Sequence, residues 1–262
     1  MNWLEALILG LIQGLTEFLP VSSSGHLELG KVLFGHSGEE GTLAFTVSVH
    51  AATVLSTLIV FRKDIADIFK EVLKIEWNNS TKYLSMLLLS MLPVAILGIF
   101  FKDYVESFFT GNSTLVGSML LITAFLLTLA HFIKPKQKKL NYFNTLIVGI
   151  AQAIAVLPGI SRSGATISTG LLLGIPREQI AKFSFLMVII PILGESFLSL
   201  LSSNYTETSV EFLPIIIGFI AAFISGLFAC SFMIKIVKKG SLIWFAVYCI
   251  MAGATAIILT LF

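Results

Sequence analysis

Two short segments of the chain carry the residues that could do chemistry. The first runs Q-G-L-T-E-F-L-P-V-S-S-S-G-H from Gln13 to His26, and the second runs Q-A-I-A-V-L-P-G-I-S-R-S-G-A-T from Gln152 to Thr166. Short hydroxyl side chains and glycines let backbone N–H groups converge on an anion, and an arginine offers a planar fork that matches phosphate oxygens. Two helix N-termini aimed at one point add positive potential. This set fits a phosphate group better than a sugar or an inorganic cation.

The first segment also holds acid–base groups. Gln13 and Glu17 are spaced i, i+4, so their side chains share one face of a helix that Pro20 ends. His26 opens the helix after the loop. A carboxylate and an imidazole beside such a loop supply acid–base catalysis or a ligand for a metal ion. The loop itself consists of Ser22, Ser23, Ser24 and Gly25.

The second segment repeats the pattern of the first. Pro158 and Gly159 break the chain, and Thr166 lies just beyond the loop. The loop consists of Ser161, Arg162, Ser163 and Gly164. Two related broken segments, one in each half of the chain, predict a shared site at the interface of two repeats. Five residues of the first half match five residues of the second half at one constant offset and without a gap. They are Gly10, Gln13, Ser22, Ser24 and Gly25, which match Gly149, Gln152, Ser161, Ser163 and Gly164 in that order.

The composition of the chain indicates a membrane protein. Of the 262 residues, 56% are hydrophobic and 12% are charged, and the mean hydropathy is +0.94. A soluble domain carries about 25% charged residues. The net charge of +2 is too small to indicate a nucleic-acid partner. Cys230 and Cys249 lie in apolar segments, where they indicate neither a disulfide nor a metal site.

Apolar runs define the expected architecture. The stretches 3–34 and 143–175 are too long for one helix and too short for two spans with a loop, so each predicts a re-entrant helix–loop–helix hairpin. The fold class is therefore an all-α polytopic integral membrane protein, with six transmembrane helices and two re-entrant hairpins in one membrane domain, 1–262. Its inverted repeats are about 1–134 and about 140–262. The six expected spans are 43–61, 83–101, 114–133, 182–202, 212–234 and 242–262.

The basic residues of the loops predict the orientation. With six crossings, all basic connections fall on the same side of the membrane, and that side should be cytoplasmic. Both termini then face outward, the first hairpin enters from outside and the second from inside. Their loops should meet near the bilayer midplane. The basic connections are 62–82, 134–139 and 235–239.

Simpler interpretations compete for some of these residues. Serine and glycine in membrane helices often serve close packing alone, and each serine cluster by itself is equally consistent with that role. A charge at membrane depth costs roughly 3 kcal/mol, which favours a function for Glu17 and Arg162. A structural ion pair between them is the alternative. His50 is expected to line a cavity or to bond a neighbour, and Glu195 needs a partner that the sequence does not identify.

At these two segments the chain resembles the undecaprenyl pyrophosphate phosphatases of the bacitracin-resistance type. The resemblance covers essentially the whole chain. The first segment resembles the family signature E/Q-x-x-x-E followed by a Ser-rich loop and His, and P-G-I-S-R-S-G-A-T resembles the second signature. It implies hydrolysis of undecaprenyl pyrophosphate to undecaprenyl phosphate and inorganic phosphate in the bacterial plasma membrane. This recycles the lipid carrier of peptidoglycan synthesis, and bacitracin competes for the same lipid.

The resemblance also implies roles for individual residues. A divalent cation, Mg²⁺ or Ca²⁺, is expected at Glu17 and Gln13. Gln13 stands where the family accepts Glu or Gln, so one carboxylate is offered and a dedicated two-carboxylate site is not expected. Ser23 matches the proposed nucleophile, and Ser161 with Arg162 matches the phosphate-binding pair. The expected catalytic residues are Glu17, Ser23, His26 and Arg162. The expected substrate-binding residues are Gln13, Ser22, Ser24, Gly25, Ser161, Ser163, Gly164 and Thr166.

Three questions stay open at the level of sequence. Attack by Ser23 and attack by an activated water are both compatible with these residues, with His26 as general base and then acid. Inverted repeats are also transporter architecture, so movement of undecaprenyl phosphate or another anion across the membrane is the second hypothesis. The presence of Ser23 and His26 at one loop favours the enzyme. The oligomeric state, a homodimer included, does not follow from the sequence.

Overall fold

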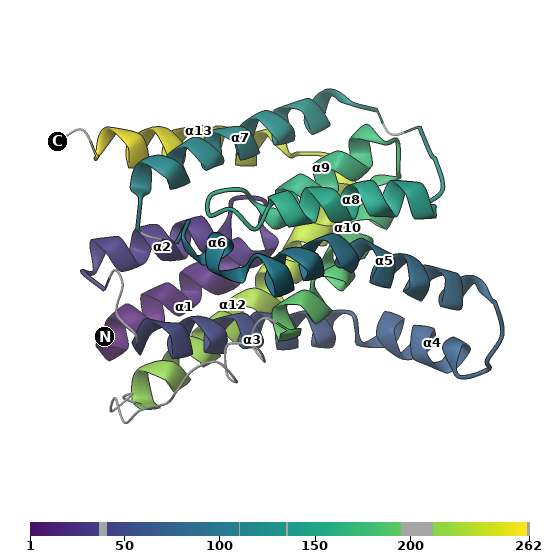
Figure 1. Cartoon of the computed structure of the whole chain (residues 1–262), viewed down its shortest axis with the longest axis horizontal. Helices are drawn as coiled ribbons and strands as arrows, with labels where there is room; N and C mark the ends of the chain where they lie inside the picture. Colours follow the sequence, from purple (N-terminus) through teal and green to yellow (C-terminus); the bar gives the residue numbers. More distant parts are fainter. Residues whose placement is uncertain (37–40, 110, 135, 195–211, 261–262) are drawn as a thin grey trace.

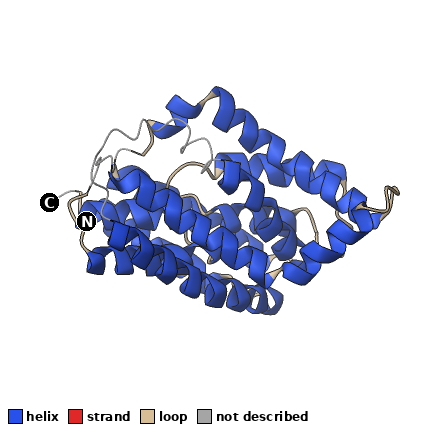
Figure 2. Cartoon of the chain, turned by 90° about the horizontal axis from the view of Figure 1, so that it is seen from below, coloured by secondary structure: helices blue, strands red, loops and turns tan. Residues whose placement is uncertain are grey.

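The structure, a computed structural model, describes residues 1–36, 41–109, 111–134, 136–194 and 212–260 (Figure 1). Within these ranges every regular element is a helix, as Figure 2 shows from a second direction. The helices of the first half are α1 (Trp3–Phe18), α2 (Ser23–Leu33), α3 (Gly41–Val60), α4 (Arg62–Val72), α5 (Asn79–Phe100), α6 (Lys102–Glu106) and α7 (Ser113–Phe132). Those of the second half are α8 (Tyr142–Ile154), α9 (Arg162–Leu172), α10 (Arg177–Met187), α12 (Phe212–Lys239) and α13 (Ile243–Ile258).

Several of the described helices are long and apolar enough to cross a membrane. By length and composition α5, α7 and α12 qualify, and α3 with α4 adds a fourth span if this pair, bent by 73°, is counted as one. These helices cover the predicted spans 43–61, 83–101, 114–133 and 212–234. Such a set of apolar helices is that of a multi-pass membrane protein.

Two other predicted spans differ from the helices of the structure. The predicted span 182–202 begins within α10. This helix starts earlier, at Arg177, and ends at Met187 with Val188 as its C-cap. Pro191 has no N–H to donate to the Met187 carbonyl, and its ring crowds that carbonyl, so the helix breaks there. After this break residues 189–194 are helical again, and the remainder of the span, from Glu195 on, lies outside the described residues. The last predicted span corresponds to α13, which has 16 residues and is therefore shorter than expected.

The predicted connection 62–82 contains a helix, α4, that the sequence analysis did not identify. Ile65 and Ile68 lie on one face of α4 and pack against the main hydrophobic core. Asp64 in its first turn pairs with Lys182 of α10. The charges of this segment, which were used to predict orientation, obscured its helical period.

Two helical hairpins approach each other from opposite ends of the bundle (Figure 1). α1 and α2 form one hairpin and α8 and α9 form the other, at the stretches 3–34 and 143–175 where hairpins were predicted. Each hairpin packs along a helix from the other half of the chain, α1 along α12 and α8 along α5. The two hairpin loops meet in the middle of the molecule. The topology thus brings the two repeated segments together.

Matched glycines allow each hairpin to pack closely. A Cβ added at Gly10 of α1 would lie 2.4 Å from the carbonyl oxygen of Gly218, and a Cβ at Gly149 of α8 would lie 2.4 Å from the carbonyl oxygen of Ser90. Gly10 and Gly149 are equivalent positions of the two repeated segments. Small residues at helix contacts are typical of packing in membranes.

The crossing of α7 and α13 is reciprocal. A Cβ added at Gly253 would lie 2.7 Å from the Gly117 carbonyl oxygen, and a Cβ at Gly117 would lie 2.7 Å from the Gly253 carbonyl oxygen. Neither position accepts a side chain unless the helices move apart. α7 and α13 are the last described helices of their halves, so the two halves meet here through corresponding elements.

Stability should therefore depend on the absence of a side chain at Gly253. Gly253→Ala is expected to cost about 1–3 kcal/mol of stability because the new methyl group overpacks the contact with α7. Gly98→Ala is the matched control, since a Cβ at this helical glycine meets nothing within 4 Å. The measurement is the thermal unfolding midpoint of each variant in the same detergent. Equal midpoints for the two variants would contradict the close crossing.

Candidate active site

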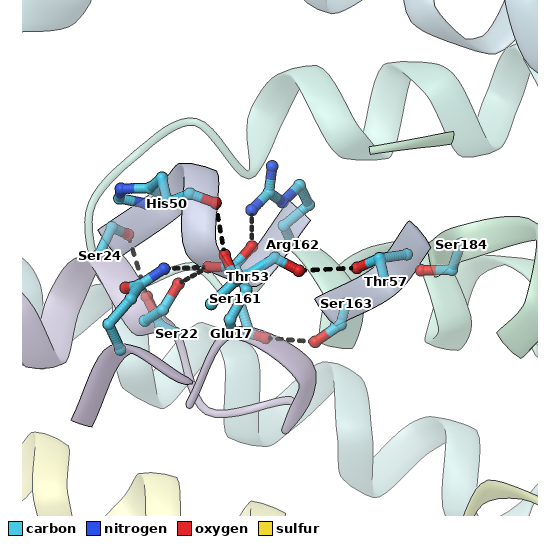
Figure 3. Close-up of polar contacts among 12 residues, drawn as sticks. Glu17, Ser22, Ser24, His50, Thr53, Thr57, Ser161, Arg162, Ser163 and Ser184 are labelled. Carbon is cyan, nitrogen blue, oxygen red and sulfur yellow. Dashed lines mark hydrogen bonds and ion pairs between the residues drawn. The ribbon is translucent and has the colours of Figure 1, made fainter. Parts of the chain in front are cut away.

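The carboxylate of Glu17 is the centre of a polar cluster between the two hairpins (Figure 3). Its Oε1 forms an ion pair with the guanidinium of Arg162. Its Oε2 accepts hydrogen bonds from Gln13 Nε2 at 2.8 Å and from Ser23 Oγ at 2.6 Å. The side chain of Glu17 is 4% exposed and that of Arg162 is 26% exposed. Residues of both repeated segments therefore meet at one buried point.

The ends of three helices place these groups. Gln13 and Glu17 lie one turn apart on the last turns of α1, as their spacing predicted. Ser23 is the first residue of α2 and Arg162 the first residue of α9. Gln13 uses its amide N–H to bind Glu17, whereas its Oε1 is buried and has no hydrogen-bond partner among the described residues. The cluster thus keeps one oxygen atom without a partner.

The second helix of each hairpin is capped in the same way. Ser22 Oγ accepts a hydrogen bond from Gly25 N at 3.3 Å, and Ser161 Oγ accepts one from Gly164 N at 3.1 Å. In both loops the capping hydroxyl also lies near the hydroxyl of the serine two positions later, at 3.4 Å and 3.3 Å. A serine that bonds the third backbone N–H after it is a typical N-cap. The matched serines and glycines of the two segments thus have matching local structures.

The two loops are also fixed to each other and to α7. Ser22 has a positive φ of 69°, an uncommon conformation for a residue other than glycine, and its Oγ accepts a second hydrogen bond from Gly159 N at 3.1 Å. Gly159 itself has a φ of 99°, and a Cβ there would lie 2.4 Å from the Val116 carbonyl oxygen. Thr123 Oγ1 donates to the Gly159 carbonyl at 3.0 Å and accepts from Ser161 N at 2.9 Å. These bonds hold the loops in register.

The geometry of the cluster suits an anion. Ser163 Oγ donates to the Leu19 carbonyl at 3.3 Å, which ties α9 to the end of α1. Because α2 begins at Ser23 and α9 at Arg162, the positive ends of both helices lie beside the ion pair. Backbone N–H groups at helix N-termini and an arginine fork are the groups that bind phosphate in proteins.

Two of the predicted substrate-binding residues have other neighbours. Thr166 Oγ1 donates to the Arg162 carbonyl at 2.8 Å and lies 2.6 Å from Ser184 Oγ of α10. It therefore contributes to the packing of α9 on α10, one turn behind the ion pair. Ser24 stays at the loop, where its Oγ lies 3.4 Å from Ser22 Oγ (Figure 3).

The hydrogen-bond partners that the structure gives to His26 are groups other than the Glu17 carboxylate. Its Nδ1 lies 2.8 Å from the Ser22 carbonyl oxygen, and its Nε2 lies 2.7 Å from the hydroxyl of Tyr248 on α13. The sequence analysis expected His26 as the general base, but the hydroxyl of Ser23 donates to Glu17 in the structure. Tyr248 was missed, because one tyrosine in an apolar helix carries no signal of a partner so distant in the sequence.

A small pocket beside the ion pair is lined in part by Thr53, Thr57 and Ser184, polar residues that the sequence analysis did not assign. It has room for about one water molecule. Its polar side is formed by Glu17, Thr53, Thr57, Arg162, Ser163 and Ser184, and its apolar side by Phe18, Val54, Phe185, Val188 and Ile192. Thr53 and Thr57 lie on the same face of α3 as His50 (Figure 3). The polar face that these residues form on an otherwise apolar span is the sequence signal by which Thr53 and Thr57 could have been found.

Gln13 and Glu17 are the residues of the cluster whose oxygen atoms could hold a divalent cation. The described residues contain no group of three or more His, Cys, Asp or Glu side chains that could hold a metal ion alone. However, the unpartnered Oε1 of Gln13 lies beside the carboxylate of Glu17. Carboxylate and amide oxygens, completed by phosphate oxygens, are the ligands that Mg²⁺ and Ca²⁺ prefer.

Comparisons with known proteins identify the family of the chain. A family model described as bacitracin resistance protein BacA matches residues 6–255. An undecaprenyl-diphosphatase of Bacteroides thetaiotaomicron is 55% identical, over 98% of the chain and 99% of the relative. One from Christiangramia forsetii is 53% identical over 98% of both, and one from Carboxydothermus hydrogenoformans is 44% identical over 99% of the chain and 98% of the relative. Because the family match includes both repeated segments, the chain belongs to the BacA family of bacitracin resistance proteins.

Proposed function

We propose that the protein is an undecaprenyl-diphosphatase, which hydrolyses undecaprenyl diphosphate to undecaprenyl phosphate and inorganic phosphate. The observation that carries this conclusion is the cluster of Glu17, Arg162 and Ser23 at the N-termini of α2 and α9. It combines an anion site, a nucleophile and a proton acceptor. Relatives that are 53–55% identical over nearly their full length carry this name. The reaction returns the lipid carrier to cell-wall synthesis and fits bacitracin resistance, because bacitracin sequesters the diphosphate form.

Substrate binding requires Arg162 to change its partner. In the structure its guanidinium pairs with Glu17, whereas a terminal phosphate offers two oxygens to the same fork. When Arg162 turns to the phosphate, Glu17 is free to accept the proton of Ser23, which already donates to it. The N–H groups at the starts of α2 and α9 stabilise the negative charge of the transition state. Binding of the diphosphate therefore prepares the site for reaction.

The chemical step uses Ser23 as the nucleophile. Ser23 Oγ attacks the terminal phosphorus while its proton passes to Glu17, and the bond from that phosphorus to the bridging oxygen breaks. The electron pair of this bond leaves with undecaprenyl phosphate. Water then attacks the phosphoserine and gives its proton to His26, and Glu17 returns its proton to Ser23 Oγ as inorganic phosphate leaves. Direct attack by water, with Glu17 as the base, is the alternative.

A divalent cation, Mg²⁺ or Ca²⁺, is part of this proposal. Glu17 and the Oε1 of Gln13 would hold it together with the oxygens of the diphosphate. Bound there, the cation neutralises charge on the two phosphates. The chain itself contributes one carboxylate, so affinity for the cation should depend on the substrate.

The proposed arrangement in the membrane is six spans with two re-entrant hairpins, in inverted halves 1–134 and 140–262. The matched serine caps and the entry of the hairpins from opposite ends support it. Basic connections come together at one end: Lys138 N donates to the Gly174 carbonyl at 3.0 Å, and Lys238 pairs with Glu178 at 2.6 Å. This end should be cytoplasmic, so the diphosphate enters from the outer face of the bacterial plasma membrane.

Transport of undecaprenyl phosphate is the competing function for an inverted repeat. A transporter would use Arg162 to bind an anion but has no need of a serine bonded to a carboxylate. The hydrogen bond from Ser23 to Glu17 therefore favours the phosphatase.

Loss of either charge of the central ion pair should stop turnover. Glu17→Gln removes the proton acceptor and Arg162→Lys removes the planar fork, so each should lower kcat/KM at least about 100-fold, or roughly 2.7 kcal/mol of transition-state stabilisation. The assay is phosphate release from undecaprenyl diphosphate by folded protein in detergent. Asp64→Asn, which breaks the ion pair with Lys182 outside the cluster, should keep wild-type activity. Near-normal activity of the Glu17 or Arg162 variant would contradict the assignment.

Ser23→Ala tests the identity of the nucleophile. We expect kcat to fall at least about 1,000-fold, because the alanine variant cannot form the covalent intermediate. Acid quenching of the wild type with substrate labelled at the terminal phosphate should leave label on Ser23. Ser118→Ala is a suitable control, since among the described residues Ser118 Oγ bonds only the Thr114 carbonyl of its own helix. Near-normal turnover of Ser23→Ala, with no labelled serine in wild type, would instead assign the attack to water.

Removal of divalent cations should abolish phosphate release, and added Mg²⁺ or Ca²⁺ should restore it. Gln13→Glu should lower the cation concentration that gives half-maximal activity, because it adds a second carboxylate beside Glu17, whereas Gln13→Leu should raise it. The measurement is a cation titration of each variant at saturating substrate. Full activity in excess EDTA would exclude the proposed role of the cation.

A further inference from the structure

Four large apolar side chains in and after α4 are not covered by the protein. They are Phe69, Leu73, Ile75 and Trp77, and their exposed fractions lie between 61% and 94%. No residue of α4 itself is buried. The segment lies at the end of the bundle away from both termini (Figure 1). Because apolar side chains gathered at the surface mark a contact site, this segment needs a partner.

α4 does not continue the span that precedes it. Its axis is bent by 73° from that of α3. Since α3 covers the predicted span 43–61 and spans tilt by about 20° on average, α4 lies closer to the membrane plane than to its normal. Six of its 11 residues are charged, which excludes α4 from the hydrocarbon. Ile65 and Ile68 pack against the core and hold the helix in this direction.

The apolar residues of α4 form one continuous stripe on the helix surface. Ile65, Phe69 and Leu73 follow one another at i, i+4 spacing, so the stripe runs from the contact with the core to the exposed end of the helix. The opposite side carries charged residues, such as Lys63 and Asp67. An apolar stripe opposite a strongly charged face is typical of helices that lie in the membrane–water interface.

The turn after α4 holds an isoleucine where its backbone favours glycine. Ile75 has a φ of 55°, a left-handed conformation that is a genuine outlier for a β-branched residue and usual for glycine after a helix. Its side chain is 94% exposed, so contacts within the described part of the chain do little to offset the strain. Insertion among lipids would remove this side chain from water and offset the strain.

The four exposed apolar residues are continuous with a surface that faces lipid. Trp77 precedes α5 by two residues, and Leu88 and Leu92 of this apolar helix are 47% and 53% exposed. Tryptophan is enriched at the ends of spans, where its ring lies among the headgroups. The segment 62–77 has four basic and four acidic residues. These charges stand between the apolar residues, which does not suit the core of an interface with a second copy of the chain.

We propose that α4 and the turn 73–77 form an interfacial anchor, in which the four exposed apolar residues insert at the boundary between phospholipid headgroups and acyl chains. The partner of this surface is therefore the membrane itself. Burial of apolar surface holds the anchor, because the basic and acidic residues of the segment balance. The charged face of α4 stays in contact with water. The anchor is independent of the reaction at Glu17.

Fluorescence of Trp77 in the full-length protein tests the depth of the turn. The chain has three tryptophans, so Trp3→Phe combined with Trp244→Phe leaves Trp77 as the reporter. In phosphatidylcholine bilayers, lipids brominated near the headgroup should quench Trp77 at least about twofold more than lipids brominated near the chain ends, and aqueous iodide should quench it weakly. A variant that keeps Trp244, which is 73% exposed on the apolar helix α13, is the control for contact with lipid.

Three results would overturn the anchor. Quenching of Trp77 by iodide, without quenching by brominated lipid, would place the turn in water. Protection of Trp77 from both quenchers would show that protein covers the surface, a second copy of the chain included. Stronger quenching by bromine near the chain ends would place the turn inside the hydrocarbon.

Ile75→Asn separates insertion from backbone strain. Asparagine adopts a positive φ more readily than isoleucine, so the variant relieves the turn but does not insert into lipid. We expect iodide quenching of Trp77 to rise at least about twofold, because the anchor loses an inserted side chain. Gln137→Asn is the matched control, since Gln137 also has a positive φ, of 57°, and should leave Trp77 unchanged. Unchanged quenching in Ile75→Asn would show that Ile75 does not insert, and would overturn the inference.

Discussion

The buried carboxylate of Glu17 is the constraint on which the rest of the site depends. A charge at membrane depth costs roughly 3 kcal/mol unless it has partners, and Glu17 is almost completely buried. Its countercharge, Arg162, comes from the other half of the chain, so the pair forms only when the two hairpin loops meet. The close glycine contacts of α1 with α12 and of α8 with α5 make that meeting possible. The fold therefore brings the Glu17 carboxylate and the Arg162 guanidinium together between the N-termini of two helices.

The two halves of the site share a scaffold but not a chemistry. Both loops use a capping serine and a glycine in the same hydrogen bond. At the position of Glu17 the second segment has Val156, and at the position of Ser23 it has Arg162. In the proposed mechanism the first half thus supplies the nucleophile and the proton acceptor, and the second supplies the Arg162 guanidinium that binds the phosphate. Under that proposal neither segment alone forms a site, and the diphosphate competes with Glu17 for Arg162.

The sequence was sufficient for the two hairpins and for the polar residues within each loop, because those features are local, and the repeat predicted that the two loops meet. Proline and glycine mark the loops, and the i, i+4 spacing of Gln13 and Glu17 places both on one helix face. Individual side-chain contacts that the folded geometry decides could not be predicted. Examples are the direction of Ser23 toward Glu17 across the loop and the contact of Tyr248 with His26, 222 residues apart. The break of α10 before Pro191 has a local signal, but hydropathy conceals it, since a proline in an apolar run does not lower the hydrophobic score enough to divide a span.

The most direct test of the account is an experimental structure with a non-hydrolysable methylene diphosphonate analogue of the lipid. The account predicts that the terminal phosphonate lies between the N-termini of α2 and α9, with Arg162 turned from Glu17 to the phosphonate oxygens and Ser23 Oγ facing the terminal phosphorus. A diphosphonate bound elsewhere, with the ion pair of Glu17 and Arg162 still closed, would show that this pair holds the fold together and is not the active site.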